Sequence, residues 1–343
     1  MESFFNMNAL KVLAKKAEKA KNYLLETQNL SHEYKIMSEK GFVYFPVNSK
    51  LRVKGYSVVS KTMQKHEKHE QDLRVLLQKK LTKKELEILK TSFDHVGTIA
   101  ILEIDDALQK KEKIIARALL DALPSVKTVL KKAGIHEGVF RTQNMQLLAG
   151  IDTRETVHRE NSVSLKLDVE HVYFSPRSST ERMRIAKLVK KGESILVMFS
   201  GCAPFPCVLS KNSAAKEIYG VELNPLGHQY GLKNVALNKL KNVFLYQGDV
   251  QAVVPALHTP FDRVLMPLPK SAEDFLDVAL AAVKKGGIIH FYDFLHEEHF
   301  AEADEKIKKA CALAKKKCRI LRTVKCGQYS PRTFRICVDV KVE

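Results

Sequence analysis

Hydrophobic positions along this chain are grouped into short runs that are separated by polar loops and amphipathic segments. The clearest example lies between Glu193 and Asn224. The apolar runs Ile195–Phe199 and Ile218–Leu223 predict two buried strands, and the residues between them predict a sharp loop followed by a helix. A buried strand, a loop that begins with glycine and a carboxylate about 20 residues further on are typical of the nucleotide-binding half of a doubly wound α/β sheet.

Strands and helices continue to alternate from residue 171 to residue 343, which predicts a parallel sheet with helices between its strands. Two final strands, Arg319–Lys325 and Thr333–Val342, are expected to close the sheet. S-adenosylmethionine methyltransferases add such a pair of strands to a Rossmann-like sheet. We therefore expect an α/β fold with a class I methyltransferase domain over residues 171–343. The other expected strands are Val243–Tyr246, Asp262–Met266 and Ile288–Tyr292, and the expected helices are Thr180–Lys190, Pro225–Leu240, Ala272–Val283 and Ala301–Lys317.

The first 170 residues predict two smaller α+β domains and a connection between them. Residues 1–70 are expected to form a small basic domain, residues 71–91 a linker and a helix, and residues 92–170 a middle domain that packs on the catalytic domain. The expected elements of the first domain are a helix over residues 8–25 and strands at Gly41–Val47 and Leu51–Val59. Those of the middle domain are a strand at Ser92–Asp105, helices at Ala107–Leu120 and Ser125–Lys132, and strands within Gly138–Gly150 and Val163–Pro176.

The net charge of +18 indicates a polyanionic partner, and nucleic acid is the leading interpretation. Residues 1–90 carry +9 and residues 171–343 carry +10, whereas residues 91–170 carry −1. The alternative is a lysine-rich solvated surface. The six cysteines form no CxxC pair, which favours free thiols in a reducing cytosol over zinc sites or disulfides. No apolar run reaches about 18 residues and the first residues lack a signal-peptide pattern, so we expect a cytoplasmic protein that does not bind membranes.

Three strand ends carry residues suited to a nucleoside ligand, namely Gly201, Glu222 and Asp249. Glu222 would accept hydrogen bonds from ribose hydroxyls, and Asp249 would accept one from the exocyclic amine of adenine. For each acid alone, a helix N-cap or a surface loop is the alternative. The loop from Gly201 to Pro206 lacks the GxGxxG series that binds a pyrophosphate, which favours S-adenosylmethionine. Phe199 would pack on this cofactor or in the core.

The turn after the fourth strand, Met266-Pro267-Leu268-Pro269, is expected to line the substrate pocket. Many methyltransferases that act on amino groups have Asn-Pro-Pro-aromatic at this point. Since no asparagine is present here, the sequence does not support methylation of an exocyclic amine. A strand that simply ends at a proline is the alternative.

Nine short motifs lie between Phe140 and Tyr292. They are Phe140-Arg141-Thr142, Leu147-Leu148-Ala149-Gly150, Tyr173-Phe174-Ser175-Pro176-Arg177, Thr180-Glu181-Arg182, Met198-Phe199-Ser200-Gly201, Glu222-Leu223-Asn224-Pro225, Gly248-Asp249-Val250, Pro267-Leu268-Pro269-Lys270 and Gly287-Ile288-Ile289-His290-Phe291-Tyr292. Together they resemble the archaeal and eukaryotic tRNA guanine-N1-methyltransferases that act at position 37, beside the anticodon.

This resemblance implies a tRNA partner, with its outer corner at the N-terminal domain and its anticodon loop at the catalytic domain. It also implies that Glu181 is the general base and that Arg141 supports catalysis. Without the resemblance, Glu181 would be assigned to a capping box with Ser178, and Arg141 to a phosphate or surface contact. The residues that match the family's cofactor-binding positions are Arg182, Phe199, Glu222, Leu223, Asp249 and Val250.

The chain departs from the family pattern at two places. Better-known members have Gly-Val-Gly-Pro-Phe where this chain has Gly201-Cys202-Ala203-Pro204-Phe205, a change that should still permit a tight cofactor turn. They also have Asn-Leu-Pro where this chain has Pro267-Leu268-Pro269, which removes a side-chain amide near the target base.

The resulting hypothesis is a monomeric tRNA methyltransferase that transfers the methyl group of S-adenosylmethionine to guanine N1 and has no metal site. A paralogue on the wyosine pathway, which methylates or aminocarboxypropylates the modified guanosine at the same position, is the first alternative. A non-catalytic RNA-binding protein on the same fold is the second. It would bind RNA but would not bind S-adenosylmethionine.

Overall fold

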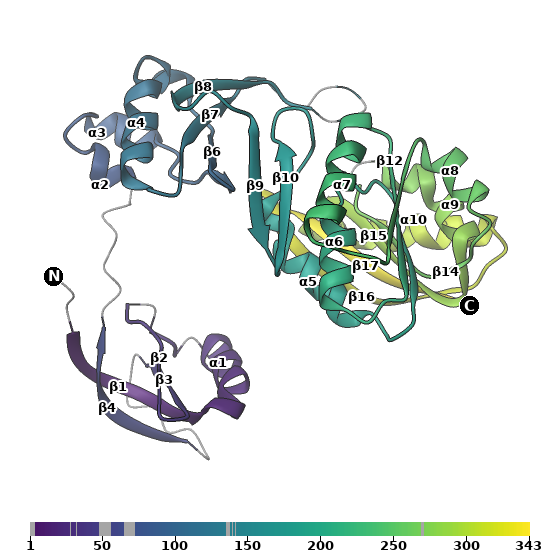
Figure 1. Cartoon of the computed structure of the whole chain (residues 1–343), viewed down its shortest axis with the longest axis horizontal. Helices are drawn as coiled ribbons and strands as arrows, with labels where there is room; N and C mark the ends of the chain where they lie inside the picture. Colours follow the sequence, from purple (N-terminus) through teal and green to yellow (C-terminus); the bar gives the residue numbers. More distant parts are fainter. Residues whose placement is uncertain are drawn as a thin grey trace. The chain divides into compact units, whose positions relative to one another are not determined.

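The computed structural model describes residues 4–27, 29–31, 33–47, 56–64, 73–134, 138, 140, 142–268 and 271–343. The chain forms two compact units, Met1–Thr82 and Lys83–Glu343, and each has its own hydrophobic core (Figure 1). No helix of the described part is long and apolar enough to cross a membrane. The finer division at residues 70, 91 and 170 stays a proposal.

The first unit is built on a four-stranded antiparallel sheet in the order β2-β3-β1-β4. Its elements are β1 (Phe4–Leu13), a 3-10 turn (Ala14–Lys16), α1 (Ala17–Glu26), β2 (Met37–Glu39), β3 (Phe42–Pro46), β4 (Ser57–Gln64) and the short α2 (Leu73–Leu77). Side chains of α1 pack on the sheet, where Leu10, Leu24 and Phe45 are buried together. Tyr44 is also buried, so these strand aromatics contribute to packing within the unit.

The helix expected over residues 8–25 is wrong in its first half, where the chain forms β1. This strand lies between β3 and β4, and Leu10 is opposite Phe45 on one side and Val58 on the other. A central strand satisfies its backbone groups on both sides, and this pairing outweighs the helical spacing of the apolar residues. The lysine-rich second half forms α1. Of the strand expected at Leu51–Val59, residues 51–55 lie outside the described residues.

The second unit begins with α3 (Lys83–Ile88) and a four-stranded sheet that is covered by α4 (Glu112–Ala122). Its strands are β5 (Asp94–Val96), β6 (Ile99–Leu102), β7 (Thr128–Lys132) and β8 (Met145–Gly150), in that order. A 3-10 segment, Asp106–Lys111, precedes α4, so the expected helix at 107–120 is confirmed in outline. The hairpin of β9 (Glu155–Glu160) and β10 (Val163–Asp168) follows.

The helix expected at Ser125–Lys132 is wrong, because residues 128–132 form the inner strand β7. Thr128, Val129 and Leu130 are fully buried between β6 and β8. Short apolar runs of this length do not distinguish a buried strand from a buried helix by their periodicity. The single strand expected at Ser92–Asp105 is likewise divided into β5 and β6, which pair with each other.

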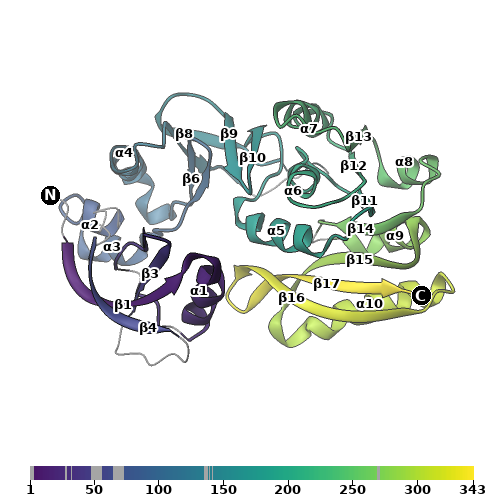
Figure 2. The same ribbon diagram turned by 60° about the horizontal axis from the view of Figure 1, so that its bottom comes forward.

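The remaining residues form a seven-stranded sheet in the order β13-β12-β11-β14-β15-β17-β16. The first five strands are parallel, and β17 pairs antiparallel with both β15 and β16. The elements are α5 (Ser179–Leu188), β11 (Ser194–Val197), α6 (Pro204–Asn212), β12 (Glu217–Glu222), α7 (Pro225–Leu237), β13 (Val243–Gln247), α8 (Val250–Ala256), β14 (Phe261–Met266), α9 (Leu276–Ala282), β15 (Val283–His296), α10 (Phe300–Leu313), β16 (Cys318–Ser330) and β17 (Thr333–Val342), with 3-10 turns at Pro176–Ser178, Ala272–Phe275 and Glu297–His299. The predicted Rossmann-like α/β fold with a closing strand pair is confirmed (Figure 2).

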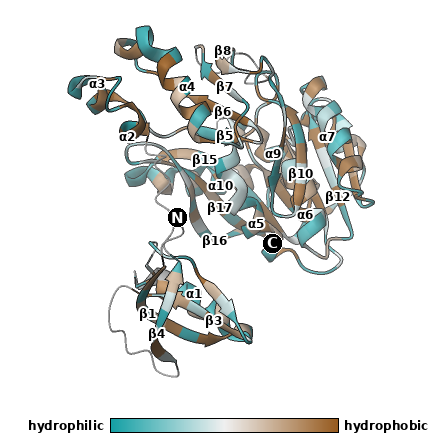
Figure 3. Ribbon diagram, turned by 60° about the vertical axis from the view of Figure 1, so that its left-hand side comes forward, coloured by the Kyte–Doolittle hydropathy of each residue, from teal (hydrophilic) through white to brown (hydrophobic). Residues whose placement is uncertain are grey.

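Helices cover both faces of this sheet and form two separate cores. Ile185 of α5 and Val208 of α6 pack on one face. Val254 of α8, Leu280 of α9 and Ile307 of α10 pack on the other. Figure 3 shows that α6, α9 and α10 carry both hydrophobic (brown) and hydrophilic (teal) residues. The strand order reverses between β11 and β14, and ligands of open α/β sheets bind at the carboxyl ends of the strands at such a point.

The six cysteines are all free thiols, as the sequence predicts. Four of them are buried, and Cys202 and Cys207 lie at the beginning of the α6 segment. Burial raises the pKa of the Cys202 thiol to about 12. This thiol is therefore protonated at neutral pH and acts as a small apolar side chain.

Candidate cofactor and substrate site

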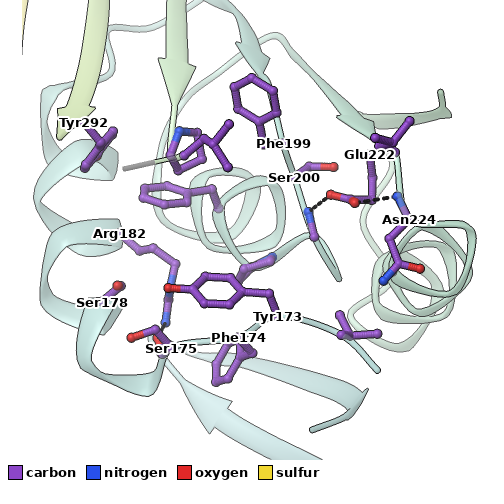
Figure 4. Close-up of a pocket in the computed structure, with 18 of the residues that line it drawn as sticks. Tyr173, Phe174, Ser175, Ser178, Arg182, Phe199, Ser200, Glu222, Asn224 and Tyr292 are labelled. Carbon is purple, nitrogen blue, oxygen red and sulfur yellow. Dashed lines mark hydrogen bonds between the residues drawn. The ribbon is translucent and has the colours of Figure 1, made fainter. Parts of the chain in front are cut away.

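A cavity of about 190 Å³ lies at the carboxyl ends of β11, β12 and β14 (Figure 4). Its walls come from the segment before α5, from α5 itself, from the loop after β11 and from strands β15 and β17. The lining includes the expected residues Glu181, Arg182, Phe199, Gly201, Glu222, Leu223, Pro267 and Leu268. The structure therefore brings together residues that the sequence places as far as 87 positions apart, from Glu181 to Leu268.

The loop after β11 is tightly folded because alternate residues have left-handed backbone angles. The φ angles are 57° at Phe199, 56° at Gly201 and 63° at Ala203. The strand expected to reach Phe199 therefore ends at Val197. Only glycine takes this conformation without strain, so Ala203, where better-known family members have glycine, is a strained residue at the start of α6.

Glu222 is held by the backbone of this loop and of its own turn. Its Oε2 accepts a hydrogen bond of 2.6 Å from the Gly201 N–H, and its Oε1 accepts one of 2.7 Å from the Asn224 N–H. Burial raises the pKa of the Glu222 carboxyl, although the backbone N–H groups act in the opposite direction. The backbone N–H of Leu223 also acts on this carboxylate. Since two carboxylate oxygens offer about four acceptor positions, a position remains for a ligand hydroxyl.

The wall near Glu222 is mainly apolar. Phe199 packs edge-on against Phe275, with ring centroids 5.0 Å apart. Leu223, Pro267 and Leu268 line the same region, and Leu223 is 39% exposed. These side chains can enclose the apolar parts of a nucleoside, and the Glu222 carboxylate beside them can accept hydrogen bonds from hydroxyl groups. Pro269 and Arg141 lie outside the described residues.

Arg182 is buried in the cavity wall, where it holds neighbouring segments together. Its guanidinium forms a two-point ion pair with Glu160, with one bond of 2.6 Å, and donates to the Ser175 carbonyl at 3.1 Å. It also lies over the ring of Phe174, 5.2 Å from the centroid. Arg182 thus fixes the segment before α5 against β9, and a contact with the cofactor stays a prediction.

Glu181 lines the cavity and is hydrogen-bonded to Tyr292, which Figure 4 shows on the opposite side of the cavity from Glu222. It is 5% exposed, and its carboxylate binds Arg184 and the Tyr292 hydroxyl. Two carboxylates on opposite sides of one cavity can bind a proton-bearing group at one end and hydroxyl groups at the other.

Asp249 and Val250 are not among the residues that line this cavity. Asp249 is exposed and caps α8, because its Oδ1 accepts a hydrogen bond of 2.8 Å from the Gln251 N–H. Val250 is buried in the core under α8. The N-cap alternative therefore describes Asp249 in this structure, and its contact with adenine stays a prediction.

Three regions of the chain match known protein families. Residues 156–321 match the TRM5/TYW2 methyltransferase domain, residues 73–153 the TYW2 N-terminal domain, and residues 9–54 the tRNA methyltransferase 5 N-terminal domain. The tRNA (guanine(37)-N(1))-methyltransferase Trm5b of Pyrococcus abyssi is 36% identical over 335 residues, which are 97% of this chain and 98% of that relative. The chain belongs to the TRM5/TYW2 methyltransferase family.

Solved structures of the family share the whole architecture. The crystal structure of Trm5b from Pyrococcus abyssi has a TM-score of 0.73 at 36% identity and covers 98% of this chain and 99% of that chain. A complex of aTrm5 with tRNALeu has a TM-score of 0.71 at 32% identity, with the same coverage. A family member with another activity, the tRNA 4-demethylwyosine(37)-methyltransferase Taw21 of Saccharolobus solfataricus, is 34% identical and covers 72% of this chain and 92% of its own length.

Several cavity residues of this TRM5/TYW2 protein were not predicted as site residues. Tyr173 and Ser178 precede α5. The Arg335 guanidinium donates a hydrogen bond to the hydroxyl of each, at 3.0 Å in the case of Tyr173. Arg335 and Tyr292 come from β17 and β15. A signal existed for Tyr173 and Tyr292, which belong to the family motifs. No local pattern connects Arg335 with Tyr173, since 162 residues separate them.

One buried group in the described structure has the spacing of a metal site: His290, Cys337 and Asp339 each offer a ligand atom within 4.8 Å of the others. Asp339 instead accepts hydrogen bonds from Arg184 and Arg322, and His290 is bonded to Arg263. Three guanidinium groups around these side chains repel a metal cation and already use the ligand atoms. The cluster is a buried network of ion pairs and hydrogen bonds.

Proposed function

We propose that this protein transfers the methyl group of S-adenosylmethionine to N1 of the guanosine at position 37 of tRNA. The observation that carries the proposal is the cavity with Glu222 at one side and the buried Glu181 at the other, in a chain related over its full length to Trm5b. The protein is a tRNA methyltransferase, and S-adenosylmethionine is its cofactor.

The residues around the cavity suit this cofactor. Glu222 accepts from the ribose hydroxyls, and Phe199, Leu223 and Leu268 enclose its apolar parts. Glu222 packs closely against α7, because a Cβ atom added at Gly227 would lie 3.3 Å from the Glu222 Cγ. S-adenosylmethionine supplies an electrophilic methyl group. The protein's own residues orient it and keep water away from it.

Guanine N1 carries a proton at neutral pH, and its lone pair is not available until that proton leaves. Glu181 is the base that takes the proton, since it is the buried carboxylate on the cavity wall away from Glu222. Arg141 steadies the negative charge that grows on the adjacent carbonyl oxygen. Pro267 and Leu268 form the wall against which the base rests, in place of the family's asparagine.

The substrate is tRNA, and the target base must leave its stack to enter the cavity. The first unit recognises the outer corner of the tRNA, the second unit receives the anticodon loop, and the protein acts as a monomer in the cytoplasm. The basic excess of residues 1–90 supports the first of these roles through phosphate contacts.

Mass spectrometry of nucleosides from tRNA incubated with the protein and methyl-labelled S-adenosylmethionine tests the proposal. We expect one labelled N1-methylguanosine per tRNA, at position 37, and none in a matched transcript with adenosine there. A transcript with inosine at position 37 keeps N1–H and lacks the exocyclic amine, so it should still be methylated. An aminocarboxypropyl product, or a product only on a wyosine intermediate, would contradict the proposal and support the wyosine-pathway alternative.

A further inference from the structure

The carboxylate of Glu181 is bound at three of its four acceptor positions. Its Oε1 accepts hydrogen bonds from Arg184 Nη2 at 2.7 Å and from the Tyr292 hydroxyl at 2.6 Å. Its Oε2 accepts one from Arg184 Nε at 2.6 Å. An ionised carboxylate has about four lone-pair positions, two on each oxygen. One position on Oε2 is therefore left for a substrate N–H.

Arg184 is held in turn by a second buried carboxylate. Its Nη1 donates to Asp339 Oδ2 at 2.7 Å, and Asp339 is 2% exposed. Asp339 also accepts from Arg322 at 2.6 Å and is bonded to His290 Nδ1 at 2.6 Å. Burial lowers the pKa of His290, although Asp339 acts in the opposite direction, so the ring is neutral at pH 7. Since Arg263 donates to His290 Nε2, the His290 proton lies on Nδ1 and points to Asp339.

The strand register of β15 and β17 produces this arrangement. Tyr292 is paired with Cys337 and His290 with Asp339, and side chains two residues apart lie on the same face of a strand. The face that carries Tyr292 and Asp339 is the one against which α5 packs, since both bind residues of α5. Glu181 and Arg184 are one helical turn apart on α5 and so reach Tyr292 and Asp339 together.

This network holds the Glu181 carboxylate in position and pairs the charge of Arg184, but it does not conduct protons. A guanidinium does not lose its proton at physiological pH, so Arg184 cannot pass a proton from Glu181 to Asp339. Arg184 is bound by two carboxylates, those of Glu181 and Asp339, so its guanidinium is fixed from both sides while it orients Glu181.

We infer that Tyr292 and Arg184 are positioning residues that aim the free lone pair of Glu181 Oε2 at the substrate N–H, and that Asp339 acts on the reaction through Arg184. The inference rests on the proposed function, because it assumes that Glu181 is the base. It adds the accepting atom and three residues to that function, and two of these residues lie on the neighbouring strands β15 and β17.

The first test is Tyr292→Phe, which removes one hydroxyl and keeps the packing. We expect the single-turnover rate of methyl transfer to fall about 10-fold, as for the loss of one hydrogen bond to a charged group. The dissociation constants for S-adenosylmethionine and tRNA should stay within about 2-fold. Tyr230→Phe is the matched control, because the Tyr230 hydroxyl also donates to a carboxylate, Glu155 at 2.8 Å, and Tyr230 does not line the cavity. Its rate should not change.

The second test is a double-mutant cycle with Asp339→Asn and Arg184→Gln, measured by the same rate. If Asp339 acts through Arg184, Asp339→Asn slows the enzyme only when Arg184 is present. Equal slowing in both backgrounds would overturn the role of Asp339. Should the buried variants not fold, Tyr292→Phe still decides the role of Tyr292.

The outcomes separate this inference from the proposed function. A wild-type rate for Tyr292→Phe, in a preparation where Glu181→Gln is inactive, would overturn the inference and leave Glu181 as the base. Full activity of Glu181→Gln would remove the base itself and the inference with it. Absence of methylated tRNA from the wild-type protein would remove the proposed function.

Discussion

Replacement of Glu222 by glutamine would break the contact on which the cofactor assignment depends. The two carboxylate oxygens accept from two different N–H groups, those of Gly201 and Asn224. A glutamine amide has one acceptor oxygen, so one of these N–H groups faces an NH₂ group whichever way the amide is turned. The cofactor turn and the ribose contact are therefore lost together.

The size of the effect follows from the number of interactions involved. A buried N–H without an acceptor costs about 1–3 kcal/mol, and hydrogen bonds of hydroxyls to a charged acceptor contribute about 1.5–3 kcal/mol. Because the loop can relax, we expect S-adenosylmethionine binding to weaken by about 2–4 kcal/mol, which is roughly a 30- to 1,000-fold increase in the dissociation constant.

Calorimetric titration of S-adenosylmethionine measures this change directly. Glu217→Gln is a suitable control, since Glu217 lies at the other end of β12 and its Oε1 accepts from the Ser194 hydroxyl at 2.7 Å. The control should bind S-adenosylmethionine as the wild type does. Equal affinities of Glu222→Gln and wild type would refute the assignment of Glu222 to the ribose.

The pH dependence provides a second check, with a definite sign. Burial raises the pKa of Glu222 in the folded protein, so this group favours folding below its unfolded pKa and that contribution is lost as the pH rises through its folded pKa. Cofactor binding changes in the opposite direction, because the ribose contact needs the ionised form. Affinity should fall as the pH is lowered through the raised pKa, and Glu222→Gln should show a flat profile over the same range.

Three other predictions concern the reaction, the tRNA and the loop. Glu181→Gln should slow single-turnover methyl transfer by about 100-fold or more, as the loss of a general base does, while calorimetry shows unchanged cofactor binding; near-normal turnover would reject Glu181 as the base. Removal of Met1–Thr82 should raise the KM for tRNA and reduce its salt dependence, with cofactor affinity unchanged, because phosphate contacts are lost; an unaltered salt dependence would contradict the role of the first unit. Ala203→Gly should change the free energy of unfolding by less than about 1 kcal/mol in thermal melts, because relief of left-handed strain offsets the lost methyl contact and the extra chain entropy; a loss above about 2 kcal/mol would show that the methyl contact dominates.

The parallel part of the fold could be predicted because each buried strand is a short apolar run between turn residues. Proline at the first turn also marked the start of α7 correctly, at Pro225. The same reasoning failed for β1 and β7, where an apolar run forms an inner strand although its spacing suits a helix. Pairing with neighbours distant in the sequence decides such cases, and local patterns do not contain that information.

The candidate site was predictable as far as strand ends determine it. Gly201 and Glu222 follow β11 and β12, which are neighbours beside the point where the strand order reverses, and both line the cavity. Asp249 was chosen by the same rule but follows β13, the edge strand, which lies about 5 Å further from that point than β12 does. The contact between Glu181 and Tyr292 could not be derived, because Tyr292 is 111 residues away and reaches Glu181 only through the register of the sheet.

The closing strand β17 carries Arg335 and Asp339 four residues apart, hence on one face, where they contact Tyr173 and Arg184 respectively. A slip of one residue in its pairing with β15 would turn both side chains to the opposite face while leaving the backbone hydrogen bonds of the sheet intact. Deleting one residue within β17 should therefore damage the site as severely as removing a side chain of the cavity itself. In a transplanted or redesigned version of this domain, the register between β15 and β17 should therefore be checked as a determinant of function. A variant that folds and binds cofactor can still have a shifted register.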